Sequence, residues 1–484
     1  MAGSRGGAGA RMSDQQPEGF RAALHRAADL VADYLEKVGG LPVLPKVRPG
    51  EVRRQLPKSP PERGEPYEAL LNGYQGLIEP NVTHWNHPGF FAYFAITGSE
   101  PGILGELLTA GLNVNHMLWK SGPAPTELEE TVCDWLRQMM GLPEGFVGHI
   151  NDTASSSTLV ALAAARHRAS KGRARTHGLA GAPPMTVFAS DHVHSSIDKA
   201  CIALGLGQAH LRRVPVDDAF RMRPDALASM IAEDRHTGHV PIAVVATAGT
   251  TSTTSVDPLR AVAQVAAREG LWLHVDAAYA GPAAICPELR APFDGIELAD
   301  SIVVNPHKWL FTPVDCSVLL LKDPAVLREA FTLTPEYLKT AETGVTNLMD
   351  YGPQLGRRFR SLKLWFVIRH YGVEGLRAII RSHCAMAQEF AGWVRAEPGF
   401  EVCAPVPFST VCFRGTPPGS PESQDAFNER LLAAVNAVGP VFLVQTKLNG
   451  RFVIRLAIGN ARTQREHVRG AWDIIRTKAA ELRR

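Results

Sequence analysis

Short apolar runs alternate with helical patterns between about residues 100 and 371 of this chain. Such alternation predicts βα units, in which mostly parallel strands form a sheet that helices cover on both faces. In these sheets ligands bind at the carboxyl ends of the strands, so residues that directly follow a predicted strand are the first candidates for a functional site. The predicted strands span residues 185–189, 242–246, 271–275, 301–304 and 317–321, and the predicted helices include residues 155–169, 224–234 and 258–268.

The two ends of the chain predict smaller units. The first dozen residues are rich in Gly, Ala and Arg, which predicts disorder, whereas residues 17–37 have the apolar spacing of an amphipathic helix. The proline-rich residues 41–66 predict an extended strap that needs a partner surface, and a second copy of the chain is the simplest partner. We therefore predict a dimer-forming arm and helical segment (1–98), a large domain (99–371) and a small α+β domain (372–484). The small domain would have strands near 401–403, 410–413 and 452–457 and helices near 424–438 and 463–482.

Composition and missing motifs exclude several classes of protein. A formal net charge of +3 is small for 484 residues, so binding to nucleic acid is not expected. No window of the sequence approaches the ~20 apolar residues that are needed to cross a bilayer, so a membrane partner is not expected either. Seven cysteines without a CxxC pair predict no metal site and no disulfide framework, and they favour reduced thiols in the cytoplasm. The chain also lacks the P-loop and GxSxG motifs.

Two charged residues follow predicted buried strands. Asp276 ends one strand and precedes two alanines, and Lys308 lies between His307 and Trp309 after another. The ordinary interpretations are an acid that caps a turn and a lysine on the surface. The functional alternatives are an anion that faces a cationic ligand beside a flat slot, and an amine whose pKa is lowered by burial so that it becomes a nucleophile.

Two further segments complete a pattern. Thr153, Ala154 and Ser155 open a predicted helix, where they either cap it or bind a phosphate with the free N–H groups. His194 follows another predicted strand and either bonds to the backbone or stacks on an aromatic ligand. A phosphate site, an acid for a ring cation, a flat slot and a buried lysine together are what pyridoxal phosphate requires of a protein.

The chain also resembles the group II pyridoxal-phosphate-dependent decarboxylases, and within them the aromatic-L-amino-acid decarboxylases. The resemblance runs from about residue 17 to the C-terminus. It implies pyridoxal 5'-phosphate as cofactor, a fold like that of aspartate aminotransferase (fold type I), and a homodimer with active sites at the interface. The matching segments are VTHWNHPGFFAYF (82–94), PAPTELEETVCDWL (123–136), DTASSSTLVAL (152–162), SDHVHSSIDKA (190–200), HVDAAYAG (274–281), ADSIVVNPHKWL (299–310) and LGRRFRSLKLWFVIRHYGVEGL (355–376).

The resemblance implies catalytic roles for four residues. Lys308 would form the Schiff base with the cofactor, and Asp276 would pair with the pyridine nitrogen. His194 would stack on the cofactor ring, and Tyr337 matches the loop tyrosine that protonates the substrate carbon after carbon dioxide leaves. The cofactor would contact Thr153, Ala154, Ser155, His194, Thr251, Asp276, Ala278, Asn305, His307 and Lys308.

The resemblance also implies a substrate pocket. Tyr93 and Phe94 match pocket aromatics, and Gly356 matches the small residue that leaves space for a ring. Asn115 and Met117 stand where the family has an isoleucine and a phenylalanine from the partner subunit. The pocket would therefore be more polar and could prefer a tyrosine-like or DOPA-like ring, or a smaller polar side chain. The substrate is expected among Trp85, Tyr93, Phe94, Asn115, Met117 and Gly356.

These matches predict decarboxylation of an L-amino acid, expected to be aromatic, to the amine and carbon dioxide through a Schiff base and a quinonoid intermediate. One alternative is an aromatic aldehyde synthase, in which the loop tyrosine is typically phenylalanine. The others are a decarboxylase of a non-aromatic amino acid and a catalytically silent scaffold. Tyr337 favours the amine, and the intact Lys308, Asp276 and His194 argue against the scaffold. Arg455 lies on a predicted C-terminal strand. A transaminase could use an arginine at such a place to bind its substrate carboxylate.

Overall fold

The computed structural model describes residues 17–333, 335–339, 341–416 and 423–483. The first dozen residues, for which we predicted disorder, lie outside this part of the chain. In the described part no helix has both the length and the apolar character that crossing a membrane requires. All seven cysteines are free.

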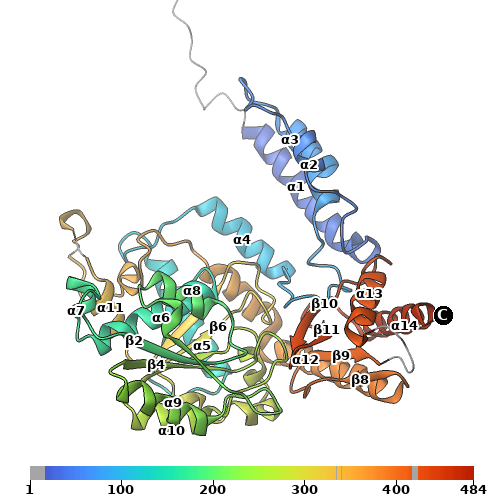
Figure 1. Cartoon of the computed structure of the whole chain (residues 1–484). Coiled ribbons are helices and arrows are strands. Elements are labelled where there is room, and N and C mark those ends of the chain that lie inside the picture. The colour runs from blue at the N-terminus through green and yellow to red at the C-terminus, as the bar shows by residue number, and fades with distance from the viewer. Residues whose placement is uncertain (1–16, 334, 340, 417–422, 484) are drawn as a thin grey trace, which may run out of the picture.

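Seven strands form the central sheet, in the order β1-β7-β6-β5-β4-β2-β3 (Figure 1). All neighbours pair in parallel except β7, which runs antiparallel to both β1 and β6. The predicted mostly parallel sheet is therefore confirmed. The sequence does not predict β1 or β3, because VGHIN and LRRV are short and carry polar side chains. The strands are β1 (Val147–Asn151), β2 (Met185–Ser190), β3 (Leu211–Val214), β4 (Val240–Thr247), β5 (Trp272–Asp276), β6 (Ser301–Val304) and β7 (Ser317–Leu321).

Helices cover both faces of this sheet (Figure 1). Along β4, Ala243 and Val245 pack into the core on one face, and Val244 and Ala246 pack into the core on the other. Strands buried on both faces are apolar at every position, which is why these runs could be found in the sequence. One face carries α6 (Ala154–Ala169) and α8 (Ser196–Ala203), and the other carries α9 (Pro224–His236) and α10 (Leu259–Arg268).

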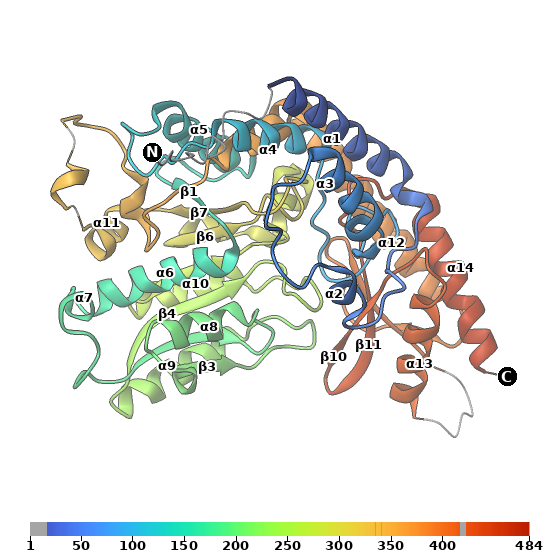
Figure 2. The same cartoon turned by 90° about the horizontal axis from the view of Figure 1, so that it is seen from above.

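A second, antiparallel sheet of order β10-β11-β9-β8 lies beside the large domain (Figure 2). The sequence does not predict β10, whose central residues Gln445, Thr446 and Lys447 are polar. The long helix α12 is kinked at Gly372 (φ 63°, ψ 171°), next to the predicted domain boundary; the boundaries themselves stay predictions. The elements are β8 (Phe400–Val402), β9 (Thr410–Gly415), β10 (Val444–Leu448), β11 (Arg451–Ala457), α12 (Ser361–Ala396), α13 (Gln424–Asn436) and α14 (Arg465–Leu482).

The N-terminal helices project from the body of the molecule (Figure 1). The helix α1 has the predicted bounds, and the Nη2 of Arg26 donates a hydrogen bond to Oδ1 of Asn72 at 2.6 Å between α1 and α3. The strap 41–66 is not wholly extended as predicted, because it contains the short helix α2. The remaining helices are α1 (Pro17–Lys37), α2 (Glu51–Gln55), α3 (Tyr67–Gly73), α4 (Glu100–Leu112), α5 (Pro123–Met139), α7 (Arg173–His177) and α11 (Ala325–Phe331).

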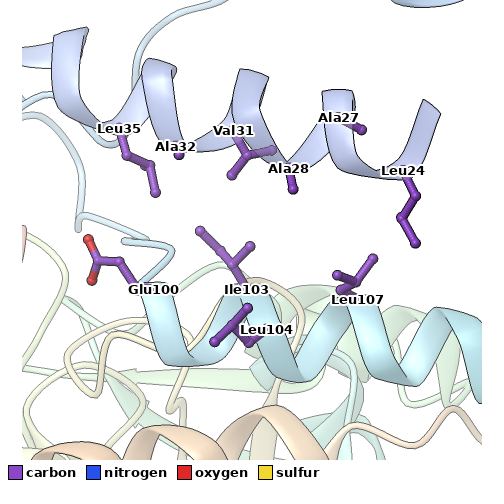
Figure 3. Close-up of a pocket in the computed structure, with 10 residues that line it drawn as sticks. All are labelled: Leu24, Ala27, Ala28, Val31, Ala32, Leu35, Glu100, Ile103, Leu104 and Leu107. Atoms are coloured by element: carbon purple, nitrogen blue, oxygen red, sulfur yellow. The ribbon is translucent and has the colours of Figure 1, made fainter. Parts of the chain in front are cut away.

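An apolar cavity of about 320 Å³ separates α1 from α4 (Figure 3). Leu104 and Leu107 of α4 line it and are 55% and 46% exposed, and Leu108 and Leu112 of the same helix are 50% and 61% exposed. Contiguous apolar surface of this kind marks an interaction site. The cavity is lined by Leu24, Ala27, Ala28, Val31, Ala32 and Leu35 of α1 and by Glu100, Ile103, Leu104 and Leu107 of α4.

Candidate active site

Loops that follow five strands of the central sheet meet at one cavity of about 240 Å³. They follow β1, β2, β4, β5 and β6, whose carboxyl ends share one edge of the sheet. The cavity brings together Lys308, Asp276 and His194, as the predicted site requires. All ten residues expected to contact the cofactor line it; which of them do so stays a prediction. The lining is Phe94, Thr153, Ala154, Ser155, His194, Thr247, Gly249, Thr251, Asp276, Ala278, Tyr279, Asn305, His307 and Lys308.

Lys308 is positioned by the turn that follows β6. Its backbone N–H donates to the carbonyl of Asn305 at 2.9 Å, and its Nζ lies 5.5 Å from the centre of the Phe94 ring. Burial lowers the pKa of the Lys308 amine, and the carboxylate of Asp276 opposes that shift. A lower pKa increases the neutral fraction of the amine, which is the nucleophilic form.

Asp276 and His194 have fixed orientations. Asp276 is the buried last residue of β5, and its Oδ1 accepts a hydrogen bond from the N–H of Ala278 at 3.0 Å. The Nδ1 of His194 accepts from the backbone N–H of Ser196 at 3.1 Å, so the proton of the neutral ring lies on Nε2. Although His194 is accessible from the cavity, desolvation by the surrounding protein lowers its pKa, and Asp276 opposes the shift. A neutral imidazole ring and a buried acid therefore face the same space.

Polar groups at the start of α6 and after β6 suit an anion. The Thr153 side chain does not cap α6, so the first N–H groups of this 16-residue helix have no cap and present its positive dipole end. The Nδ1 of His307 accepts from the N–H of Cys316 at 2.9 Å, and burial followed by the charge of Lys308 lowers the pKa of His307 to about 3. Within the described part of the chain, the buried Oδ1 of Asn305 has no hydrogen-bond partner, which marks a place for a bound polar group.

Aromatic rings support one wall of the cavity. Phe94 stacks on Tyr279 with ring centroids 3.7 Å apart, and Tyr279 stacks on Trp309 at 5.0 Å. Tyr93 and Phe94 also line an adjoining cavity of about 420 Å³. Trp85 lines neither cavity and stacks on Tyr93 at 5.8 Å. Of the predicted substrate residues, these three therefore lie on the side of Lys308.

Arg455 lines the second cavity but is not among the site residues that we predicted from the sequence. It is 3% exposed, its Nε donates to the carbonyl of Ser252 at 2.8 Å and its Nη1 donates to the carbonyl of Tyr93 at 3.3 Å. Its Nη2 has no partner, and no acid pairs with it, among the residues that the structure describes. Burial lowers the pKa of Arg455. A buried guanidinium without a counterion attracts an anionic ligand; the sequence signal is a charged residue inside the apolar strand FVIRLA.

Four predicted residues, Asn115, Met117, Tyr337 and Gly356, line neither cavity. They gather in what we call the outer cluster: residues 115–119, 336–338, 347–349 and 356–358. The N–H of Met349 donates to the carbonyl of Met117 at 3.0 Å, and Leu338 packs with Met349 and Leu118. Tyr337, next to Leu338, is 75% exposed. One chain thus places the predicted residues in two separate groups.

The residues around Lys308 match the needs of pyridoxal phosphate. A phosphate fits the uncapped start of α6 and the polar side chains after β6. The carboxylate of Asp276 is available for a ring nitrogen and the amine of Lys308 for an aldehyde, since both residues line the same cavity. No group of three or more His, Cys, Asp or Glu side chains in the described part could hold a metal ion.

Comparison with known proteins agrees with this geometry. Residues 49–416 match the pyridoxal-dependent decarboxylase conserved domain. The chain belongs to this family. It is 40% identical to phenylacetaldehyde synthase from Arabidopsis thaliana, over 98% of this chain and 99% of that protein, and 42% identical to tyrosine decarboxylase 2 from the same plant, over 98% and 89%. The crystal structure of Oryza sativa TDC with PLP and tryptamine superposes with a TM-score of 0.94 at 40% identity, covering 97% of this chain and 99% of that one.

Membership in this family settles the reaction class. The protein is a pyridoxal-phosphate-dependent carboxy-lyase that acts on an amino acid. The predicted fold, a central mostly parallel sheet with an N-terminal helical arm and a small C-terminal α+β unit, is confirmed by the structure and by its solved relatives.

Proposed function

We propose that this decarboxylase converts an aromatic L-amino acid into its amine and carbon dioxide, at sites that a homodimer completes. The observation that carries the proposal is the convergence of Lys308, Asp276 and His194 on one cavity at the start of α6. Support for an aromatic substrate comes from relatives named for tyrosine, tryptophan and phenylacetaldehyde, and from the rings of Tyr93 and Phe94 beside Lys308.

The residues of the first cavity would hold the cofactor. Lys308 would hold the aldehyde carbon of the cofactor through Nζ, and Asp276 would pair with its ring nitrogen. When bound, the cofactor would supply an electron sink for the electron pair that a broken bond at the substrate Cα leaves behind. His194, Ala278 and Thr251, which line the same cavity, would contact the cofactor ring. The residues that would hold the phosphate are Thr153, Ala154, Ser155, Asn305 and His307.

Arg455 would attract the substrate carboxylate. Arg455 lines the second cavity, its buried Nη2 has no hydrogen-bond partner among the described residues, and its guanidinium carbon is 5.2 Å from the centre of the Phe94 ring. A carboxylate that later leaves as carbon dioxide must not be stabilised more strongly than the transition state. We therefore assign to Arg455 a contribution to binding rather than to bond breaking.

A second copy of the chain would complete the site. The exposed leucines of α4 and the apolar face of α1 leave a surface that a partner can bury. Asn115, Met117, Gly356 and Tyr337 lie away from the Lys308 cavity of their own chain. In the homodimer the outer cluster of one copy closes the cavity of the other, and the substrate lies between them. We propose the cytoplasm as the location of the protein, because the cysteines are free and thiols stay reduced there.

The phenol of Tyr337 would give a proton to the substrate carbon after carbon dioxide leaves, so amine is the proposed product. The second candidate is an aldehyde synthase, which the similarity to phenylacetaldehyde synthase and to Rhodiola rosea 4-hydroxyphenylacetaldehyde synthase favours. In that reaction the amino acid, oxygen and water yield aldehyde, carbon dioxide, ammonia and hydrogen peroxide.

A product analysis tests the proposal. Purified protein with added cofactor is incubated with L-tyrosine, L-DOPA, L-tryptophan, L-phenylalanine and L-glutamate, and carbon dioxide, amine, aldehyde and peroxide are measured. We expect equal amounts of carbon dioxide and amine from at least one aromatic amino acid. Turnover of glutamate alone would contradict the proposed substrate class, and stoichiometric aldehyde and peroxide would establish the second candidate.

A further inference from the structure

A buried carboxylate outside the outer cluster contacts two of its residues. Glu129, on α5, is 0% exposed. The Nε2 of His116 donates to its Oε2 at 3.1 Å, and the N–H of Ile150 donates to its Oε1 at 2.7 Å. The Nη2 of Arg357 forms a short ion pair with the same Oε1. His116 and Arg357 are buried as well.

The carboxylate of Glu129 is ionised in this setting. Burial alone would raise its pKa, but the charge of Arg357 and the hydrogen bonds from His116 and Ile150 outweigh burial and lower the pKa to about 2. Charged hydrogen bonds in a dry interior are strong and directional, so they restrict the segments that they join.

The two partners of Glu129 lie inside the segments that carry the predicted substrate residues. His116 lies between Asn115 and Met117, and Arg357 follows Gly356. The segments also contact each other directly, because Oδ1 of Asn115 accepts from the N–H of Arg357 at 2.9 Å. A third contact connects these segments to the cofactor cavity. The Nη2 of Arg357 donates a hydrogen bond to the carbonyl of Ile150 on β1, the strand that precedes α6.

We propose that Glu129 is a positioning residue that sets the substrate preference of this enzyme, by fixing His116 and Arg357 and thereby the side chains that the outer cluster presents to the partner's cavity. The inference rests on the proposed function. Glu129 does not contact substrate in this account. It determines how far Asn115 and Met117 stand from the ring, and so which ring fits.

Three variants separate positioning from folding. His116→Ala removes one donor and leaves the ion pair of Glu129 with Arg357, and His116→Gln keeps a donor in its place. Glu129→Gln removes the charge. The matched control is His167→Ala, which breaks the pair between the largely buried His167 and the exposed Glu329 (3.7 Å) at the far end of α6.

The measurements are kcat and KM for L-tyrosine and L-tryptophan, cofactor absorbance and the mass of the dimer. For His116→Ala we expect the KM of the better substrate to rise about tenfold and kcat to change less than about threefold. The ratio of the two kcat/KM values should shift about fivefold. His116→Gln should restore most of the ratio, and His167→Ala should leave it unchanged. Glu129→Gln should shift the ratio at least as far as His116→Ala if it folds.

A folded, cofactor-loaded His116→Ala dimer with the wild-type ratio would overturn the inference, whether or not Glu129→Gln folds. An equal loss for both amino acids would do the same, because it would show a general structural role. Wild-type protein that releases no amine from any amino acid would contradict the proposed function and this inference with it. Wild-type turnover with unchanged ratios in the variants would contradict the inference alone.

Discussion

The cofactor cavity and the outer cluster, the two places where the predicted site residues gather, differ in how much of a site one chain builds. At the cavity, loops from five strands of one sheet bring the amine, the acid and the uncapped helix together. In the outer cluster, Tyr337 is largely exposed, and it, Asn115, Met117 and Gly356 line no part of that cavity. We propose that one chain builds the cofactor site, whereas substrate selection and the proton donor Tyr337 need the second copy.

The largest effect is expected from a substitution of Lys308, in the cofactor cavity. We expect Lys308→Ala to lower kcat at least about 10⁴-fold, because Lys308 is the only lysine among the described residues that line the cavity and so the only amine there that can hold the cofactor aldehyde. The dimer mass and the melting temperature should change little. Amine release and cofactor absorbance measure the effect.

The matched control is Lys322→Ala, at the lysine that directly follows the reversed strand β7. Lys322 is exposed and does not line the cavity, so activity should persist. A Lys308→Ala enzyme that keeps a tenth of the wild-type rate would remove Lys308 from its assigned role.

In the outer cluster, Tyr337→Phe removes one hydroxyl. We expect amine formation to fall about 100-fold, because a positioned general acid contributes about that much or more. Aldehyde and peroxide should appear in its place, since oxygen can react when the proton is delayed. Amine, aldehyde and peroxide are measured from the same reaction, and an unchanged amine-to-aldehyde ratio would show that Tyr337 is not the proton donor.

Arg455 lies on the cavity side and should affect binding. Arg455→Met keeps an unbranched, flexible side chain and removes the guanidinium charge, so we expect the KM for the preferred amino acid to rise at least about tenfold with a smaller change in kcat. The cofactor dissociation constant should stay at its wild-type value. A fall in kcat with unchanged KM would move Arg455 from binding to bond breaking.

The smallest effect concerns stability, which both regions share. Burial lowers the pKa of His149 to about 3 and of His274 and His383 to about 4. The unfolded chain binds protons at these histidines below about pH 6.5, before the native state does, so the free energy of unfolding falls as pH falls through that range. Asp257 acts in the opposite direction, because burial raises its pKa to about 6 and the native state then binds its proton first.

Three histidines outweigh the one aspartate. Each histidine contributes about 1.4 kcal/mol and the aspartate offsets about 0.8 kcal/mol, so we expect the free energy of unfolding to be about 3 kcal/mol lower at pH 5.5 than at pH 7.5, which lowers the melting temperature by a few degrees. Thermal melts at the two pH values measure this difference. A melting temperature that rises on acidification would contradict the direction that we derive.

The parts of the fold and site that the sequence predicts are local in the chain. Asp276 ends one largely apolar buried strand and Lys308 comes four residues after another, so strand and site could be found together. The strands β3 and β10 were not predicted because they contain polar side chains. Arg455 was not predicted as a site residue because it lies inside a strand that is otherwise apolar and was expected to belong to the core.

The outer cluster depends on contacts that spacing does not reveal. Glu129 meets His116 thirteen positions away but meets Arg357 only across 228 positions. Such pairs form because α5 packs against β1 and α12, which a single sequence does not show.

A mixed dimer tests most directly whether one chain's cavity is completed by the other chain's outer cluster. Lys308→Ala and Gly356→Trp chains carry different tags, and the dimer with both tags is purified. A Cβ at Gly356 would meet only Asn115, at 4.0 Å, so the first atom of a side chain makes no close contact within its own chain. Each parent dimer should be inactive. The mixed dimer contains one intact lysine facing one intact outer cluster, and it should recover about half of the wild-type activity.

The reciprocal arrangement places both substitutions on one chain and pairs it with wild type. That dimer should be inactive, because each of its cavities lacks either the lysine or the open outer cluster. Activity in this dimer, together with an inactive mixed dimer, would show that each chain completes its own site and would contradict the account.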